Sequence, residues 1–286
     1  MIAVGVVVPA RDEQERVVAC LHSVRRALER LPAGTASAVA VVLDRCVDRT
    51  PERVAALVAG WPQAEAVHVT HPASVPETPL DISAPETGAP ETGVPGVGVP
   101  GVGTPGVGVP GVGAPGVGAL RDLGIRRVLA RLGAYPPERT WLLSTDADST
   151  VPPEWVVMHL RHATSGAHAV AGLAELAGVR HLPVEALDRY QAIVASGVHG
   201  ARHDHVYAAN LGVRADAYLA VGGFPRSGPG EDHGLWRRLH VAGYHLEQPT
   251  DLRVRTSARV HGRAGGGLAE LLRSLHPTRS AMRGGA

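Results

Sequence analysis

The chain has 286 residues, of which 44% are hydrophobic, which is enough for one large domain or two small ones. Its 28 basic and 27 acidic side chains nearly balance, so no nucleic-acid partner and no strong attraction to anionic membranes are expected. Two cysteines without zinc-binding spacing fit a reducing compartment. The sequence has no apolar run near the roughly 20 residues of a membrane span and no signal-peptide pattern, so we expect a cytoplasmic protein.

Apolar strands alternate with amphipathic helices along the first part of the chain. Continuous apolar runs are typical of strands that are buried on both faces. The expected strands are 2–8, which Pro9 should end, then 38–43, 66–70 and 141–145; the expected helices start at Asp12, Thr50 and Leu120. This alternation predicts an α/β fold with a mostly parallel sheet.

Residues 72–118 interrupt this alternation. The segment is rich in Pro, Gly, Glu and Thr, and its pentapeptides ending in Pro-Gly-Val-Gly resemble the elastin repeat. It has no helical period and few groups able to form a core, so we expect a disordered insertion in a surface loop. Residues 1–71 and 119–265 are then expected to form a single domain, followed by a C-terminal helix and basic tail at 266–286.

The second half of the chain continues the mixed pattern. Expected elements are a helix starting at 149–153, a strand at 167–172, a helix at 184–198, and a helix that Glu231 opens and Gly243 ends.

The most informative stretch is 141–149, an apolar run that ends in Asp146 and Asp148. Where a strand leaves an open α/β sheet, side chains reach the crevice beyond its carboxyl end. Two carboxylates there suit Mg²⁺ or Mn²⁺, which take their remaining ligands from substrate phosphates. Asp-x-Asp alone is more typical of a loop with two solvated aspartates, and the further motifs of the chain favour the metal site.

A series of such motifs, in order, resembles the family-2 glycosyltransferases. They occupy residues 8–13, 41–50, 118–124, 146–148, 209–214, 222–224 and 231–232. Each is weak alone, but their order extends over nearly the whole chain outside the insertion. The resemblance implies a GT-A fold, with a Rossmann-like, mostly parallel central sheet and helices on both faces. It also implies metal-assisted, inverting transfer of a sugar from a nucleotide-sugar donor to a hydroxyl.

For the donor, the resemblance places Asp44 on the nucleotide base. Arg11 replaces a residue that is often aromatic in the family, and its planar guanidinium can stack on a base. Asp12 is either part of this pocket or only a helix cap, and Arg121 either faces the diphosphate or merely covers a helix. The residues expected at the donor are Pro9, Ala10, Arg11, Asp12, Asp44, Arg121, Asp146 and Ala147.

For the metal, the resemblance makes Asp148 the direct ligand. Asp146 would contact the ribose, the sugar or a metal-bound water. The Mg²⁺ or Mn²⁺ would neutralise charge on the departing diphosphate. His261 is a candidate third ligand, although one His among 15 is more often structural.

On the acceptor side, the resemblance makes Asp232 the general base that takes the acceptor's proton. Glu231 and Asp232 would also favour a helix N-terminus electrostatically, which is compatible with that role. The residues expected to shape the acceptor cleft are Asn210, Gly222, Gly223 and Glu231, and the glycines could equally serve a tight turn. The basic C-terminal region leaves open an acceptor with a phosphate or lipid diphosphate, and hence peripheral membrane contact, or a solvated tail.

Two other functions compete with sugar transfer. A nucleotidyltransferase would carry a Gly-rich basic loop after the first strand, and residues 9–13 contain no Gly. A non-catalytic scaffold would assemble through residues 72–118, but carboxylate motifs on both sides of that segment argue against it.

Overall fold

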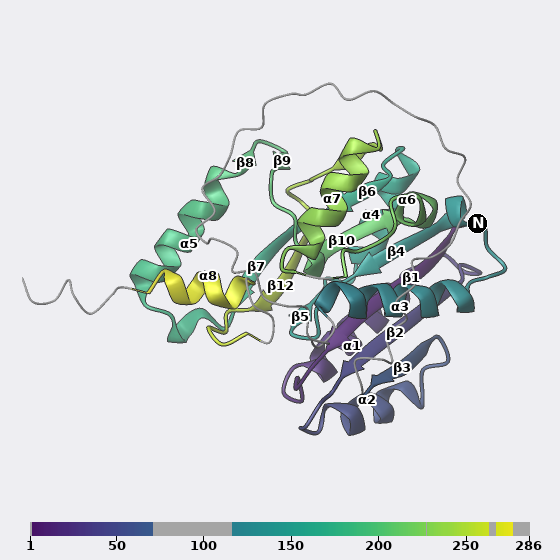
Figure 1. Cartoon of the computed structure of the whole chain (residues 1–286), viewed down its shortest axis with the longest axis horizontal. Helices are drawn as coiled ribbons and strands as arrows, with labels where there is room; N and C mark the ends of the chain where they lie inside the picture. The colour runs from purple at the N-terminus through teal and green to yellow at the C-terminus, as the bar shows by residue number, and fades with distance from the viewer. Residues whose placement is uncertain (1, 71–115, 227, 263–266, 277–286) are drawn as a thin grey trace, which may run out of the picture.

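The computed structural model describes residues 2–70, 116–226, 228–262 and 267–276. Its centre is a sheet of seven strands (Figure 1). These are β1 (Ala3–Ala10), β2 (Ser37–Asp44), β3 (Ala64–Val69), β4 (Thr140–Ser144), β6 (Ala169–Ala171), β10 (Leu211–Arg214) and β11 (Leu246–Glu247). They lie in the order β11-β6-β10-β4-β1-β2-β3, and only β10 runs antiparallel to its neighbours. The predicted mostly parallel α/β sheet is confirmed.

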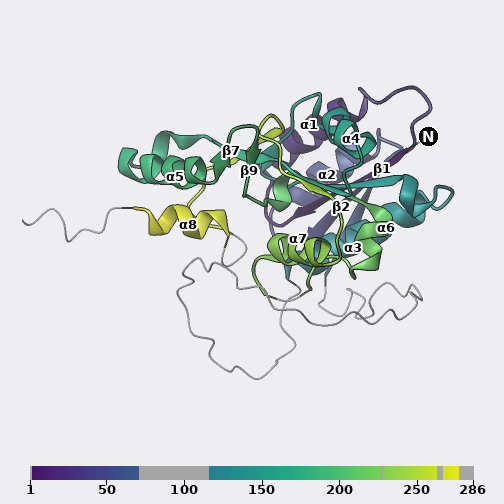
Figure 2. The same cartoon turned by 90° about the horizontal axis from the view of Figure 1, so that it is seen from above.

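Helices cover both faces of this sheet, as Figure 2 shows from above. One face carries α1 (Val17–Leu28), α2 (Thr50–Val58) and α4 (Trp155–Thr164), and the other carries α3 (Val117–Arg131), α6 (Ala215–Ala220) and α7 (Glu231–Val241). Strand β1 explains the two cores, because successive side chains of a strand point to opposite faces. Val6 and Val8 enter the first core, whereas Val7 enters the second.

A smaller part of the molecule lies beyond the sheet edge. It contains the sheet β5 (Ser149–Thr150), β12 (Arg253–Ser257) and β7 (Leu173–Ala177), and the hairpin β8 (Val198–His199) and β9 (Arg202–His203). Helices α5 (Val184–Ser196) and α8 (Leu268–Ser274) pack side by side around Leu182, Tyr190, Ala258 and Leu272 (Figure 1). Short 3₁₀ helices occupy Pro137–Arg139, Val179–His181 and Ala208–Asn210.

Three predicted element boundaries are wrong. Strand β1 continues through Pro9 to Ala10. Proline has no N–H to donate to a neighbouring strand, but the pairing of β1 with β4 ends at Val7, so Pro9 lies where β1 has a free edge on that side. Helix α1 begins at Val17 instead of near Asp12, whose side chain accepts a hydrogen bond from another loop. The segment after Asp148 is strand β5, paired with β12, and α4 begins only at Trp155.

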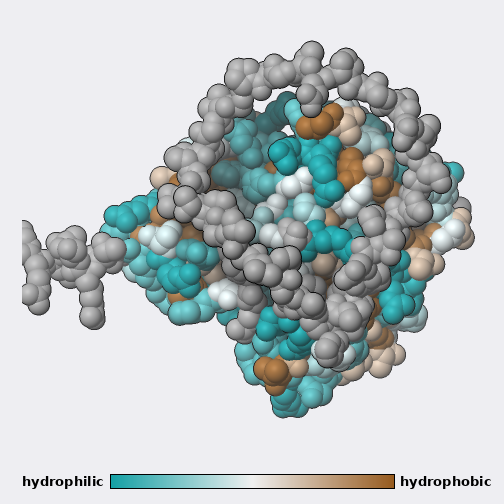
Figure 3. Space-filling view, in the orientation of Figure 1, coloured by the Kyte–Doolittle hydropathy of each residue, from teal (hydrophilic) through white to brown (hydrophobic). Residues whose placement is uncertain are grey.

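The predicted insertion at 72–118 lies outside the described residues except for its last three. Of these, Val117 and Gly118 already belong to α3, so the folded part resumes slightly earlier than predicted. On the face shown in Figure 3, hydrophilic side chains predominate among the described residues, and apolar ones form small separate patches. Within the described part of the chain, no helix has both the length and the apolar character needed to cross a membrane.

Candidate active site at the carboxyl edge of the sheet

The carboxyl ends of β1, β2 and β4 meet at one edge of the sheet because these strands are parallel and adjacent. The chain leaves β1 towards β2 on one side and returns to β4 on the other, which makes the β1–β4 boundary a topological switch point. Ligands bind α/β sheets at such points. The fold therefore gathers Ala10, Arg11, Asp44 and Asp146 along one edge, as the motif order predicted.

Asp44, at the end of β2, is paired with two arginines. The Arg45 guanidinium donates from Nε to Oδ1 at 2.7 Å and from Nη2 to Oδ2 at 2.8 Å, while Arg11 Nη1 lies 3.7 Å from Oδ2. The hydrogen bond to Asp44 raises the pKa of Arg45. Arg45 was not among the predicted site residues, because a neighbour in sequence gives no sign that its side chain folds back.

The loops after β1 and β2 are joined by side-chain hydrogen bonds. Asp12 Oδ1 accepts from the Val47 amide at 2.8 Å, and Asp48 accepts from the amides of Gln14 at 3.1 Å and Thr50 at 2.9 Å. Asp12 and Arg45 have φ values of 51° and 45°, a left-handed conformation that costs non-glycine residues energy. Asp12 therefore fixes the loop next to the expected donor pocket and does not cap a helix.

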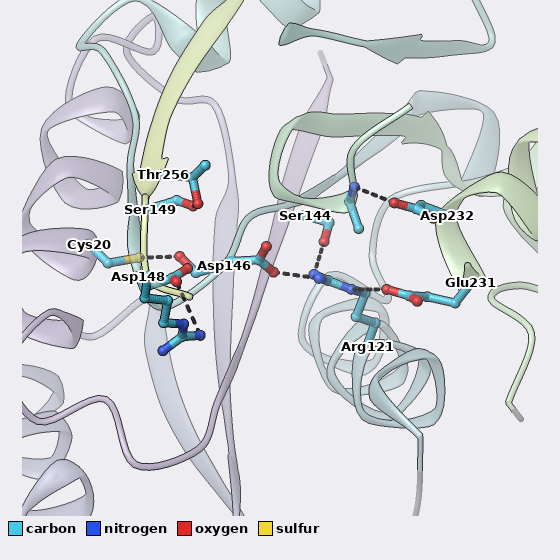
Figure 4. A network of polar contacts seen from close by, with 11 residues as sticks. Cys20, Arg121, Ser144, Asp146, Asp148, Ser149, Glu231, Asp232 and Thr256 are labelled. Atoms are coloured by element: carbon cyan, nitrogen blue, oxygen red, sulfur yellow. Dashed lines mark hydrogen bonds and ion pairs between the residues drawn. The ribbon is translucent and has the colours of Figure 1, made fainter. Parts of the chain in front are cut away.

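The two aspartates of the Asp-x-Asp motif each have a different arginine partner (Figure 4). Asp146 pairs with Arg121, and Asp148 Oδ2 lies 3.1 Å from Arg259 Nη2. Their side chains are 35% and 9% exposed, so Asp146 reaches solvent more than Asp148 does. Burial, reinforced by the negative charge of Asp146, raises the pKa of Asp148 to about 6, although Arg259 opposes the shift. Behind the motif, the Cys20 thiol donates to the Asp146 carbonyl at 3.2 Å.

Arg121 connects this motif to the other side of the site. It projects from α3, is 3% exposed, and donates to Ser144 Oγ at 2.5 Å and to Glu231 Oε1 at 3.3 Å as well as to Asp146. Its guanidinium also lies 5.9 Å from the centre of the Phe224 ring. The neighbouring carboxylates raise the pKa of Arg121 against the opposing effect of burial. Arg121 is thus a buried bridge between β4 and α7, and its contact with the donor diphosphate stays a prediction.

Glu231 and Asp232 open α7 directly after Gly230. Glu231 is buried against Arg121, and its pKa is raised by burial and by the charge of Asp232, with Arg121 opposing. Asp232 is half-buried and accepts a hydrogen bond from the Ala208 amide at 3.2 Å (Figure 4). It accepts a second one from the His233 amide at 2.8 Å. The two adjacent carboxylates consequently have different surroundings, one paired with an arginine and one held by amides.

Asn210 occupies the protein interior, not the surface of a cleft. Its side chain is fully buried, its Oδ1 accepts from Trp155 Nε1 at 2.8 Å, and its Nδ2 donates to the carbonyls of Leu173 at 2.9 Å and Leu252 at 3.1 Å. The amide thereby joins α4, β7 and the segment before β12. With both donor hydrogens and the acceptor oxygen of its amide used internally, Asn210 holds these segments together, and its part in shaping the acceptor cleft stays a prediction.

Gly222 and Gly223 form a turn that only glycine suits. Their φ values are 76° and 69°, and a Cβ on Gly223 would lie 2.8 Å from the Tyr218 hydroxyl. That hydroxyl receives a hydrogen bond from the Phe224 amide at 3.1 Å, so the turn sets the ring that faces Arg121. The structural need for the glycines is explained, and their contact with an acceptor stays a prediction.

The remaining predicted residues differ in exposure. Pro9, Ala10 and Ala147 are buried, whereas the Arg11 side chain is 42% exposed. His261 is exposed and lies beyond β12, and its role as third metal ligand stays a prediction. Glu13 and Arg259 were not predicted as site residues, yet they form an ion pair beside Asp148.

Comparison with known proteins identifies the fold. The chain matches no protein-family model and no curated protein. Among solved structures it is similar to S. aureus TarS 1-349, with 12% identity and a TM-score of 0.54 over 90% of this chain and 61% of that one. It is likewise similar to the mannosyltransferase PcManGT from Pyrobaculum calidifontis in complex with GDP-Man and Mn²⁺, with 15% identity and a TM-score of 0.54 over 91% and 57%.

A third structure, TarS 1-349 in complex with UDP-GlcNAc, matches with 12% identity and a TM-score of 0.55 over 96% of this chain and 65% of that one. This chain therefore spans less than two thirds of the length of these structures. At such identities the likeness concerns the fold alone, and the chain has a fold of the GT-A type.

Proposed function

We propose that this protein transfers a sugar from a nucleotide-sugar donor to an acceptor hydroxyl, with inversion and with the help of Mg²⁺ or Mn²⁺. The observation that carries the proposal is that carboxylates from three separate segments of the chain lie at the carboxyl edge of a GT-A sheet. These are Asp44, the Asp146–Asp148 pair and the Glu231–Asp232 pair, and Arg121 bridges the second pair to the third. Two similar structures contain UDP-GlcNAc or GDP-Man with Mn²⁺, which supports this choice.

The donor would bind with its base near the end of β2. Asp44 offers a carboxylate to a ring N–H, and the half-exposed Arg11 offers a planar surface for stacking. Since Arg45 already holds both oxygens of Asp44, the base would share or replace that contact. The diphosphate would then lie towards Asp146 and Asp148, at the end of β4.

The residues at the end of β4 would supply ligands to a divalent cation. Asp146 and Asp148 supply hard carboxylate oxygens, and the neighbouring Glu13 is buried with Oε2 lacking a hydrogen-bond partner. Together with Glu231, these carboxylates make four negative groups, and Arg121, Arg259 and Arg16 supply three positive ones, so negative charge is in excess. When bound, the cation would neutralise the charge that develops on the departing diphosphate.

Asp232 would act as the general base. Its carboxylate takes the proton of the acceptor hydroxyl while that oxygen bonds to the anomeric carbon. The bond from this carbon to the diphosphate oxygen breaks, and the nucleoside diphosphate leaves with the electron pair. Attack from the face opposite the diphosphate gives inversion. The amides of Ala208 and His233 hold the carboxylate in one direction, which such proton transfer needs.

Replacing Asp232 by Asn tests this assignment. We expect D232N to bind nucleotide sugars with Mn²⁺ as wild type does, measured by thermal shift, because the substituted group lies on the acceptor side. Turnover, measured as nucleoside diphosphate released from UDP-, GDP- or TDP-hexoses, should fall roughly 10²–10⁴-fold through loss of the base. D188N, on the exposed surface of α5, is the matched control. Near-normal release by D232N would exclude Asp232 as the base, and the absence of any donor response in wild type would reject sugar transfer.

A further inference from the structure

The guanidinium of Arg259 lies between two buried carboxylates beside the proposed cation site. Arg259 follows β12, and its Nη1 donates to Glu13 Oε1 while its Nη2 lies 3.1 Å from Asp148 Oδ2. Glu13 and Asp148 belong to the loops after β1 and β4, and their side chains are only 4% and 9% exposed. One positive group thus joins three segments that are distant in sequence.

The unused oxygen of Glu13 indicates that this arrangement leaves coordinating capacity. Glu13 Oε2 is buried without a hydrogen-bond partner, whereas the Oε1 of the same carboxylate contacts Arg259. A buried carboxylate oxygen without a partner is costly, since its charge has left water without full compensation. A cation ligated by Asp148 and reaching Glu13 would satisfy this oxygen as well.

We propose that Arg259 is the internal counter-ion of the cation site, that a divalent cation displaces its guanidinium from Asp148, and that Glu13 becomes a further ligand of that cation. This inference rests on the metal site of the proposed function, but it does not depend on sugar transfer. Arg259 and the cation compete for the same carboxylate, and two positive groups side by side repel each other. Binding of the cation is therefore an exchange of partners.

The exchange has a physical advantage for the cation-free protein. Without a positive group, the carboxylates of Glu13 and Asp148 would face each other in a poorly solvated place and destabilise the folded loops. The guanidinium has a fixed fork of donors that spans two carboxylates, which an ammonium group does not match. Arg259 therefore keeps the site assembled, at the expense of weaker cation binding.

Titration with Mn²⁺ alone, followed by the electron paramagnetic resonance of the free ion, tests the exchange without any nucleotide sugar. We expect R259Q to bind Mn²⁺ about tenfold more tightly than wild type, because a competing charge is removed. In EDTA, R259Q should melt below wild type and recover when Mn²⁺ is added. Adding E13Q to R259Q should reverse most of the gain in affinity. R253Q is the matched control, since Arg253 lies on β12 and pairs with the exposed Glu175.

The outcomes separate this inference from the proposed function. Folded R259Q with wild-type or weaker Mn²⁺ affinity would overturn the exchange. If R259Q does not fold, R259K decides: an affinity severalfold higher than wild type supports the exchange, because one ammonium cannot hold both carboxylates, and an unchanged affinity contradicts it. Tighter Mn²⁺ binding by R259Q without donor binding by any variant would leave the exchange standing and reject sugar transfer.

Discussion

Arginine partners define the charge balance of the candidate site at the level of single residues. Asp44 is held by Arg45, Asp146 by Arg121 and Asp148 by Arg259. Removing one member of a buried ion pair leaves an uncompensated charge, which costs about 3–5 kcal/mol. The three partners differ in exposure, because the Arg121 side chain is 3% exposed whereas those of Arg45 and Arg259 are 25% and 22% exposed. Arg121 is therefore a permanent part of the framework, and the other two are placed where ligands could replace them.

The partners of Asn210 lead to a prediction about pH. His159 Nε2 lies 3.3 Å from Asn210 Oδ1, and burial lowers the pKa of His159 from 6.5 to about 3. The folded state thus holds His159 neutral, whereas the unfolded state takes up a proton as the pH falls below 6.5. Stability from this group is complete above pH 6.5 and is lost as the pH falls towards 3. Between pH 7 and pH 5 the loss is about 2 kcal/mol.

The variant H159Q removes this titration and keeps an amide near Asn210. We expect the free energy of unfolding, measured with guanidinium chloride, to drop from pH 7 to pH 5 in both proteins. The drop in H159Q should be about 2 kcal/mol smaller than the drop in wild type. The loss of the ring lowers stability at both pH values equally, so the difference between them is the readout. His203, whose pKa burial lowers to about 4, contributes in both proteins. H22Q, on the exposed face of α1, is the control, and an equal pH dependence of wild type and H159Q would contradict the prediction.

The sequence predicted the carboxylates of the site better than their partners. Asp44 ends one buried strand and Asp146 and Asp148 follow another, a local pattern that parallel strands convert into proximity. The pairing of Arg259 with Glu13 joins residues 246 positions apart, and no local pattern marks it. The family resemblance placed Asn210 at the acceptor cleft, but no local pattern marks the burial of its amide among three segments that are distant in sequence.

At the level of elements, strands could be predicted more reliably than helix starts. Buried parallel strands are continuous apolar runs, and the first four expected strands lie within two residues of the observed ones at every boundary. The helix signals at Asp12 and 149–153 failed because tertiary contacts used the same residues. Asp12 bonds the loop after β2, and Ser149 donates to Thr256 Oγ1 at 2.9 Å in the second sheet.

Close packing of α3 on the sheet gives a prediction at this level. A Cβ added to Gly124 would lie 2.2 Å from Val7 Cγ2 and 2.9 Å from Val42 Cγ2. Valine side chains on strands are stiff and cannot turn away, so α3 would have to move. Overpacking costs about 1–3 kcal/mol, which exceeds the helix-propensity gain of at most about 1 kcal/mol. We therefore expect G124A to lower the urea midpoint of unfolding.

G60A provides the matched control for this substitution. A Cβ at Gly60 meets nothing within 4 Å. Its replacement by Ala should leave stability unchanged, or raise it by about 0.4–1 kcal/mol because Ala lowers the conformational entropy of the unfolded chain. If G124A were as stable as G60A, the close approach of α3 to β1 and β2 would be wrong.

At the level of the whole molecule, the two cores on either side of the sheet are formed by residues on both sides of the 72–118 segment. Core residues of β1, β2 and α1 come before it, and those of β4, α4 and α7 come after it. The candidate site is divided in the same way, because Asp44 precedes the segment and Asp146 follows it. The two parts must therefore associate for either core or site to form, whatever connects them.

Replacement of residues 72–115 by a Gly/Ser linker of about ten residues tests whether this connection has a function of its own. The cut leaves α3 complete, because α3 begins at Val117. Closure entropy changes by only about 0.6 kcal/mol for each halving of a flexible loop, so the shortened chain should be as stable as wild type or slightly more stable. We expect it to keep its thermal-shift response to nucleotide sugars with Mn²⁺ and its rate of nucleoside diphosphate release.

The control is a chain in which residues 72–115 are scrambled at constant length. It separates the effect of loop length from that of the Pro-Gly-Val-Gly repeats. If warming makes wild type sediment as larger species while neither altered chain does, and no transferase activity is found in any of them, the repeat-mediated scaffold replaces sugar transfer as the function. If both altered chains retain donor binding and turnover, the repeats are dispensable for catalysis, and the activity belongs to the GT-A fold that the flanking segments build together.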